Sequence, residues 1–450
     1  MSEKIDVSRQ VGVGRDELWM PDHTLSYDID RSYMLLEKLE RVAGAVGDSI
    51  CQAEIDQSLE FAENAVKQFT EYKKGGKVDE RRGHTFLIPV TVSETEEAPG
   101  ESYEEIKTAL PMLHYVDAMT RHRTLLSLPP CEVGRYEPFE GSEVSGIAMY
   151  TPITAEIANQ NDRRQALKIA RNIVNETVDF AATYHGSDVV GLGGVIPAFT
   201  RFGKKIDVDV ETTTGHAGTV RMIAETVDIS KEVFNIDESN SLSLIGCGSI
   251  GSAFAEYMLE SQPGTNLHVY DDDRDTQQRM VRKLRDMFGE ERVVPADNIK
   301  QAIEASIVTV SAVIGSLAEN EGYDEVDFYR RVLIDDSHPP SVSRNDIENR
   351  GGNVMWVIGD GAGIIKRLPV REDMPSVKFC GGKVALESDV WGCEAEVGAL
   401  AATRAFGAIN SPVTSEDVHA VGRAFKELSI GPSAPQSFGR LINPKVLSSK

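Results

Sequence analysis

The chain has 450 residues, of which 41% are hydrophobic and 26% are charged, and its formal net charge is -24. This composition is typical of a folded globular protein with two or three domains, and it excludes a low-complexity or disordered chain. Nucleic acids and anionic membranes repel a polyanion, so the charge argues against either as the main partner.

The N-terminal stretch MSEKIDVSRQ has no apolar segment of the kind that a secretory signal contains, and no stretch is long enough to span a bilayer. We therefore expect a cytoplasmic protein without a membrane span. The five cysteines are odd in number and lack close pairs. This spacing argues against a disulfide framework and against a zinc site, so we expect no bound metal.

Apolar residues recur at helical spacing over residues 30–72, which predicts two helices, and over residues 162–184, which predicts a third. The run HTFLIPVTV (84–92) predicts a short strand. In VVGLGGVIPAF, Gly193 and Gly194 mark a tight bend whose amides are candidate donors to an oxyanion. The segment TTTGHAGTVRMIAETVDIS, which offers the Thr214-Gly215 amides for the same role, begins a helix whose N-terminus suits an anion.

The strongest signal is SLSLIGCGSIGSAFAEYMLE, in which an apolar strand runs into Gly246-x-Gly248-x-x-Gly251 and a helix follows at once. Such glycines permit a tight turn and let the backbone approach a pyrophosphate. A second strand, residues 266–270, ends at Asp271, about 20 residues further on, where an acid binds the ribose hydroxyls. We therefore predict a dinucleotide-binding unit for NADH or NADPH, with candidate cofactor-binding residues Gly246, Gly248, Ser249, Ile250, Gly251, Asp271, Asp272, Ser311 and Ala312.

Downstream, predicted strands alternate with helices as far as a strand that ends at Asp335-Asp336. This alternation predicts a parallel sheet, and ligands bind at the carboxyl ends of its strands, near Ser311, Ser337 and His338. His338 is either an acid–base group or a structural loop histidine. The predicted fold is thus α/β with a Rossmann-type domain over 236–375, a mostly helical region over 1–140, a substrate-binding region over 141–235 and a C-terminal helical region over 376–450.

Five short segments, taken in order, resemble the long-chain acyl-acyl carrier protein reductases of cyanobacteria over about residues 146–410. They are GSDVVGLGG (186–194), TTTGHAGT (212–219), GCGSIGSA (246–253), VLIDDSHP (332–339) and CEAE (393–396). The resemblance implies NADPH-dependent reduction of an acyl thioester to an aldehyde, with acyl carrier protein or acyl-CoA as the donor. In that family the cysteine of a C-x-A-E segment carries the acyl group, and this carries over to Cys393.

The residues around Cys393 give mixed indications about its chemistry. A cysteine at a helix start is stabilised as a thiolate, whereas Glu387, Asp389, Glu394 and Glu396 oppose that effect if they face the sulfur. Glu396 is either a cap of the first helical turn or an acid near the thiol. His216 and Lys383 are candidate cations or proton donors, and the candidate catalytic residues are Cys393, Glu396 and His216.

The letters C-x-A-E also occur at Cys51, but they lie in the N-terminal helical region, so their order along the chain selects Cys393. We expect an acyl-thioester reductase that works through a cysteine-bound acyl group. The alternatives are a plain NAD(P)-dependent dehydrogenase of an amino or hydroxy acid, with Cys393 as packing, and a non-enzymatic nucleotide-sensing or scaffold protein. The sequence leaves a homo-oligomer open.

The sequence allows two interpretations both of the preferred cofactor and of the basic face at which an acyl donor could dock. A carboxylate at Asp271 favours NADH because it repels a 2′-phosphate, whereas the resemblance and a nearby Arg274 favour NADPH. One predicted helix carries a basic face that is either a docking site for an acidic carrier protein or an ordinary solvated surface. Its residues are Arg163, Arg164, Lys168 and Arg171.

Overall fold

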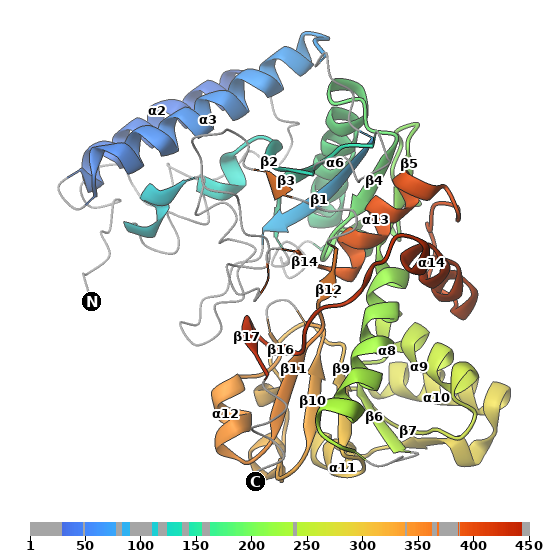
Figure 1. Cartoon of the computed structure of the whole chain (residues 1–450). Helices are drawn as coiled ribbons and strands as arrows, with labels where there is room; N and C mark the ends of the chain where they lie inside the picture. Colours follow the sequence, from blue (N-terminus) through green and yellow to red (C-terminus); the bar gives the residue numbers. More distant parts are fainter. Residues whose placement is uncertain are drawn as a thin grey trace. The chain divides into compact units, whose positions relative to one another are not determined.

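The computed structural model describes residues 29–47, 50–77, 83–90, 110–115, 124–136, 144–154, 163–236, 241–337, 340–361, 367–368, 386 and 388–442. These residues form two compact units (Figure 1). The first unit holds the described residues up to 213 together with 367–368, and the second holds those from 214 to 361 and from 386 to 442. The four regions expected from the sequence stay a prediction.

Among its described residues, the first unit has a mixed six-stranded sheet in the order β13-β2-β3-β1-β4-β5. Strands β3, β1, β4 and β5 run parallel, and β2 pairs antiparallel with β3. The strands are β1 (His84–Val90), β2 (Cys131–Tyr136), β3 (Gly146–Thr154), β4 (Val189–Leu192), β5 (Glu211–Thr213) and β13 (Arg367–Leu368). The helices are α2 (Ile29–Val46), α3 (Gln52–Lys73), η1 (Pro111–Tyr115), α6 (Arg163–Asp179), η3 (Phe180–Tyr184) and α7 (Ile196–Thr200).

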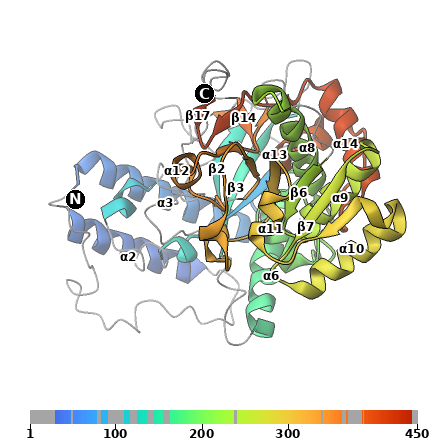
Figure 2. The same ribbon diagram turned by 90° about the horizontal axis from the view of Figure 1, so that it is seen from below.

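The helices predicted in the first unit are confirmed. Figures 1 and 2 show α2 and α3 side by side. Helix α6 buries Ala166, Ala170, Val174 and Val178, which recur every four residues and therefore share one face. This face packs in a core with strands β1, β3 and β4, and the helix continues into one π-helical turn, η3.

Acid is expected to destabilise the first unit through His84. Its ring is 3% exposed, stacks on Tyr136 with the centroids 5.3 Å apart, and has no hydrogen-bond partner for either nitrogen among the described residues. Burial lowers the pKa of His84 to about 4, below the value of about 6.5 in an unfolded chain. The stability is therefore complete above pH 6.5 and is lost as the pH falls toward 4, by up to about 3 kcal/mol.

Urea unfolding of the wild type and of His84→Phe at pH 7.5 and pH 4.5 tests this expectation. The phenylalanine keeps an aromatic ring against Tyr136 but cannot take up a proton. The variant should lose less stability than the wild type over this range, and equal losses would show that His84 does not carry the effect.

The second unit has a six-stranded parallel sheet in the order β11-β10-β9-β6-β7-β8 among the described residues. The chain runs outward from β6 to β8, returns to β9 beside β6, and then runs outward to β11. This is the doubly wound order of dinucleotide-binding folds, and it confirms the predicted α/β fold class. The order reverses between β6 and β9, which is where such sheets bind their ligands.

The sheet strands are β6 (Ser241–Ile245), β7 (Asn266–Tyr270), β8 (Val293–Pro295), β9 (Val308–Ser311), β10 (Val332–Asp335) and β11 (Asn353–Trp356). The helices are α8 (His216–Val233), α9 (Ser249–Ser261), α10 (Arg274–Phe288), η4 (Glu290–Arg292), α11 (Ile299–Glu304), η5 (Leu317–Glu319), η6 (Tyr323–Glu325), α12 (Arg344–Asn349), α13 (Gly392–Thr403) and α14 (Ser415–Glu427). Short strands β12 (Gly359–Asp360), β14 (Asp389–Val390) and β15 (Gly431–Pro432) pair with one another, as do β16 (Gln436–Ser437) and β17 (Arg440–Leu441).

Strands β9 and β10 are buried along their whole length, as expected for parallel strands covered on both faces. Helices α9 and α10 lie next to β6 and β7, whereas α12 lies at the other edge beside β11 (Figure 1). In the part of the chain that the structure describes, no helix is long and apolar enough to cross a membrane.

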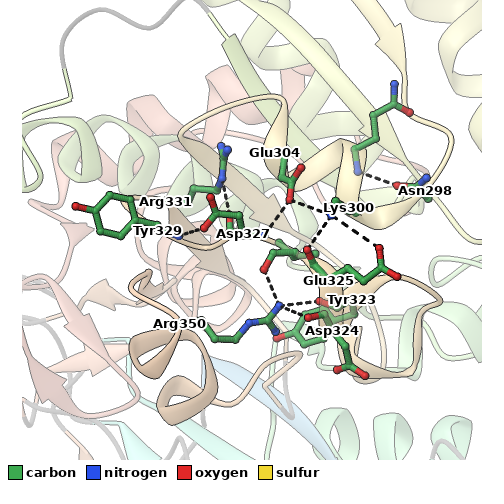
Figure 3. Close-up of polar contacts among 12 residues, drawn as sticks. Asn298, Lys300, Glu304, Tyr323, Asp324, Glu325, Asp327, Tyr329, Arg331 and Arg350 are labelled. Carbon is green, nitrogen blue, oxygen red and sulfur yellow. Dashed lines mark hydrogen bonds and ion pairs between the residues drawn. The ribbon is translucent and has the colours of Figure 1, made fainter.

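An arginine fastens the loop that leads from β9 to β10. The Arg350 guanidinium donates to the carbonyls of Tyr323, Asp324 and Val326, and it lies 4.5 Å from the centroid of the Phe328 ring (Figure 3). These bonds satisfy carbonyls of the short 3-10 helix η6 and of Val326, which follows it. The loop is thereby tied to the end of α12.

Candidate active site

The glycine-rich turn after β6 has the shape that the sequence predicts. Gly246 has φ +99°, and its amide donates to the carbonyl of Tyr270 at 2.9 Å. A Cβ on Gly251 would lie 1.9 Å from the Gly246 carbonyl oxygen, so α9 begins in close contact with the turn. A Cβ on Gly248 would meet nothing within 4 Å, so there is open space over the N-terminus of α9. This open space at free helical amides fits a pyrophosphate.

Asp271 follows β7 and faces this turn. Its carboxylate accepts hydrogen bonds from the amides of Cys247 at 2.6 Å and Asp273 at 2.9 Å, whereas Asp272 is exposed. Burial raises the pKa of Asp271, although both amides act in the opposite direction. The carboxylate thus lies at the edge of the open space, where a ribose is bound in such folds.

Arg274, the candidate partner for a 2′-phosphate, is bound elsewhere. Its guanidinium donates to the carbonyl of Ala296 at 3.0 Å and to the carbonyl of Asp297, and it lies over the ring of Tyr270. The side chain is therefore held at the end of β8.

At the carboxyl ends of β9 and β10, a buried polar network holds the two segments that follow. The Asp335 carboxylate accepts from the amides of Ser337 at 2.9 Å and Ser341 at 2.8 Å, and the Ser341 hydroxyl is 2.8 Å from that of Ser311. Burial raises the pKa of Asp335 to about 6. Ala312 lies against the glycine-rich turn, because a Cβ on Gly246 would be 2.4 Å from the Ala312 carbonyl oxygen.

Helices α8 and α13 cross in close contact at their N-termini. Gly215, the N-cap of α8, has φ +72°, and a Cβ there would lie 2.3 Å from the Cβ of Cys393. A Cβ on Gly218 would lie 2.2 Å from the carbonyl oxygen of Gly392. Small residues on both helices are thus required for the crossing, which brings Cys393 against the first turn of α8.

Glu396 is fully buried, and its carboxylate accepts from the amide of Gly218 in α8 at 2.7 Å. The expected capping role within its own helix belongs instead to Glu394, whose carboxylate accepts from the Trp391 amide at 3.4 Å. Gly215 has no side chain with which to cap α8, so Glu396 satisfies one of its first free amides from another helix. No sequence signal shows that a cap comes from a distant segment.

His216, the first residue of α8, reaches the glycine-rich turn after β6 (residues 246–251), which we call the cofactor turn. Its Nδ1 lies 3.2 Å from the hydroxyl of Ser249, which is the first residue of α9. Burial lowers the pKa of His216 to about 4, so its imidazole is neutral at neutral pH. His216 therefore cannot supply the cation considered for the thiolate, although a neutral ring can still donate or accept a hydrogen bond.

Cys393 is the second residue of α13 and is partly buried. Burial raises the pKa of its thiol, and the carboxylates of Glu394, Asp336 and Glu396 raise it further. Of the two opposing influences expected from the sequence, the one that raises the pKa prevails, through burial first and then through the carboxylates. The resting group is a thiol, and any reaction at this sulfur needs a neighbour that takes its proton.

The structure thus brings three groups predicted from the sequence together in the second unit, namely Cys393, His216 and the cofactor turn. Cys393 contacts Gly215 at the start of α8. His216, which follows Gly215, contacts Ser249 at the cofactor turn. The amide of Thr214 donates to the Ile409 carbonyl at 3.2 Å, so it is not available to an oxyanion. His338, Lys383 and Glu387 lie outside the described residues. No pattern in the sequence indicates that Asp336 raises the pKa of the thiol.

Several other candidates belong to the first unit. Gly193 and Gly194 follow β4, and Cys51 is exposed just before α3. On α6, Arg164 and Lys168 are exposed, whereas Arg171 donates to the carbonyl of Phe199 at 2.7 Å.

The sequence matches no protein-family model and no curated protein. Among solved structures, the chain is similar to an imine reductase from Bacillus cereus, with 17% identity, a TM-score of 0.21, and coverage of 26% of this chain and 40% of that chain. It is also similar to quinate dehydrogenase from Corynebacterium glutamicum in complex with NAD (16% identity, TM-score 0.30, 61% of this chain and 88% of that chain). A third is L-tryptophan dehydrogenase from Nostoc punctiforme (10% identity, TM-score 0.30, 63% and 78%). Likenesses this weak carry no argument about activity.

Proposed function

We propose that the second unit binds NADH or NADPH and that the protein is an NAD(P)-dependent oxidoreductase. The strand order, the open space over Gly248 and the carboxylate of Asp271 support this proposal. The glycine-rich turn and the first amides of α9 would hold the pyrophosphate, and Asp271 would accept from the ribose hydroxyls.

The reaction that we propose is the reduction of an acyl thioester to an aldehyde through an acyl group on Cys393. The observation that carries this proposal is the contact of Cys393 with the start of α8, whose His216 bonds to Ser249 at the cofactor turn. A nucleophile beside the cofactor is what covalent catalysis by a dehydrogenase requires. The donor is acyl carrier protein or acyl-CoA, as the resemblance implies.

Each residue has a distinct task in this reaction. Cys393 attacks the thioester carbonyl and keeps the acyl group while the donor thiol leaves. The reduced nicotinamide that the turn after β6 and Asp271 would hold would supply a hydride to the acyl carbon, after which the bond from that carbon to the Cys393 sulfur would break and the aldehyde would leave. Glu396 holds the start of α8 against α13 by its bond to Gly218, and the neutral His216 is able to donate a hydrogen bond near the cofactor turn. Holding the acyl group on the protein contributes through proximity.

Intact-mass spectrometry of the protein after incubation with a panel of acyl thioesters, without cofactor, tests this function. We expect the mass of one acyl group, mapped to Cys393, and aldehyde after reduced cofactor is added. The exposed Cys51, which shares the local letters C-x-A-E, is the internal control for non-specific acylation. A protein that accepts no acyl group from any donor would contradict the proposal.

One observation favours a second candidate. The raised pKa of Cys393 is typical of a packing cysteine, which fits a plain dehydrogenase of an amino or hydroxy acid without covalent catalysis. Cofactor reduction by a panel of amino and hydroxy acids, unchanged in Cys393→Ala, would support that function instead.

The protein is expected to prefer NADH to NADPH. The Asp271 carboxylate would repel a 2′-phosphate, and Arg274 is bound to the carbonyls of Ala296 and Asp297 at the end of β8. Titration of each cofactor, followed by nicotinamide fluorescence, should give the lower Kd for NADH. In Asp271→Asn the Kd values for NADH and NADPH should lie closer together. A lower Kd for NADPH in the wild type would overturn this expectation.

A further inference from the structure

Helices α8 and α9 lie side by side (Figure 1). At the start of both helices, the Nδ1 atom of His216 lies 3.2 Å from the hydroxyl oxygen of Ser249. Further along, the guanidinium of Arg221 donates to the hydroxyl of Tyr257 at 2.5 Å. Because these contacts follow in the same order along both helices, the helices point in the same direction and their N-termini adjoin. The positive ends of two helix dipoles therefore lie next to each other at the cofactor turn.

The start of α8, from which the His216 side chain arises, is bonded on two sides. The carboxylate of Glu396 in α13 accepts from the amide of Gly218 at 2.7 Å. The amide of His216 itself donates to the hydroxyl oxygen of Thr214 at 3.5 Å. One bond comes from another helix and one from the preceding turn, so the imidazole is carried by backbone that is held in place.

Ser249 joins His216 to the cofactor turn. It is the first residue of α9, and it follows Gly248, where an added Cβ would meet nothing within 4 Å. The first residues of a helix leave their amides free for a ligand. A hydroxyl beside them has one proton to donate and two lone pairs with which to accept. Ser249 can therefore accept from His216 and also donate to an anion bound at the same helix start.

The imidazole and the hydroxyl can share a hydrogen in two ways, of which a bound phosphate favours one. Burial lowers the pKa of His216 to about 4, so at neutral pH one ring nitrogen carries a hydrogen and the other accepts. An ionised phosphate oxygen can only accept. The Ser249 proton is therefore free for a phosphate only when Nδ1 carries the ring hydrogen and donates it to the Ser249 oxygen.

We propose that His216 is a positioning residue for the cofactor, an inference that rests on the proposed binding of NADH or NADPH. His216 holds the hydroxyl of Ser249 so that this hydroxyl donates to the pyrophosphate. Ser249 touches the cofactor, and His216 acts through it. A helix that precedes the first strand of the nucleotide-binding sheet thereby contributes to cofactor affinity. This role differs from the catalytic role expected from the sequence, in which His216 serves the thiol of Cys393.

Two substitutions of nearly equal size test the hydrogen bond of His216. In His216→Leu, the Kd for NADH, measured by nicotinamide fluorescence, should rise about tenfold, because the hydroxyl that bonds to a charged phosphate is no longer held. In His216→Asn, whose amide can bond to Ser249, the Kd should stay within about threefold of the wild-type value. Equal Kd values in the leucine and asparagine variants would overturn the inference.

A double-mutant cycle tests whether His216 acts through Ser249. Ser249→Ala alone should raise the Kd for NADH about tenfold, and the addition of His216→Leu should raise it no further, because the histidine then has no hydroxyl to hold. If the two losses multiply to about 100-fold, the two residues act independently and the inference is wrong.

ADP-ribose separates this role from one at the nicotinamide, because it carries the pyrophosphate without the nicotinamide ring. In calorimetric titrations, His216→Leu should weaken the binding of ADP-ribose by the same factor as that of NADH. A loss confined to NADH would place His216 at the reacting end of the cofactor and overturn the inference alone. A wild type that binds neither ligand would overturn the proposed function with it.

The control is His419→Leu, which removes a histidine ring from α14. That ring packs against Tyr257, further along α9, with the centroids 4.9 Å apart. The Kd for NADH should not change in this variant, and a rise as large as in His216→Leu would show a general effect of packing and contradict the inference. An unchanged Tm shows that a variant is folded. If His216→Leu does not fold, His216→Phe takes its place, because phenylalanine keeps a ring but cannot bond to Ser249.

Discussion

Cys393→Ala is expected to abolish both acyl labelling and aldehyde formation. The sulfur is the only atom of this side chain that can form a thioester, and Cys393 is partly buried against Gly215, so no other nucleophile replaces it there. Cofactor binding should stay near normal, because the residues that we assign to it lie on the turn after β6 and at the end of β7. Labelling is read by intact mass and peptide mapping, aldehyde by trapping, and cofactor binding by fluorescence.

Two variants make this expectation specific. Cys393→Ser keeps the size of the side chain but should react very slowly, because a hydroxyl is a far weaker nucleophile at neutral pH. Cys51→Ala removes the cysteine with the same neighbouring letters and should be fully active. A folded Cys393→Ala that still makes aldehyde at the wild-type rate would rule out the cysteine-bound acyl group.

Two glycines of the cofactor turn are expected to respond differently to the same added methyl group. In Gly251→Ala, the new Cβ would lie 1.9 Å from the backbone oxygen of Gly246, so the turn must shift. We expect loss of NADH binding together with more than about 2 kcal/mol of stability. In Gly248→Ala, the new Cβ meets no protein atom within 4 Å but occupies the space over the α9 amides. NADH affinity should fall at least about tenfold with Tm unchanged, because the methyl group stands where the pyrophosphate approaches.

Gly407→Ala is the control, since a Cβ there also meets nothing within 4 Å and Gly407 lies outside the cofactor turn. Calorimetric titration with NADH and thermal unfolding separate affinity from stability in all three variants. Unchanged NADH affinity in Gly248→Ala would show that the open space is not the pyrophosphate site.

The cofactor turn was predictable from sequence because its determinants are local. Gly246, Gly248 and Gly251 stand next to the strand and helix that they join, and the predicted strand 266–270 is confirmed with the same bounds as β7. Period and glycine spacing carry this information without tertiary contacts. The full strand order, by contrast, follows only from how the strands pair.

The surroundings of Cys393 were not predictable for the opposite reason. Glu396 binds Gly218, which lies 178 residues away along the chain, and Asp336 comes from a strand end in another segment. A sequence pattern shows a helix start and its dipole, but it does not show burial or which carboxylates fold back onto the sulfur. Glu394 and Glu396 could be named from the sequence as groups that oppose a thiolate, whereas the burial of the thiol and the effect of Asp336 depend on the tertiary fold.

The crossing of α8 and α13 also sets the order in which the site can be made. Helix α8 precedes the first strand of the parallel sheet, and α13 follows the last, so the whole nucleotide-binding sheet is synthesised between the two helices that meet at Cys393. Contacts between segments so far apart close a long loop and form late in folding. A growing chain on the ribosome therefore completes its cofactor turn well before it has a cysteine to place beside it, and α14 with the last short strands is still to be made when that cysteine appears.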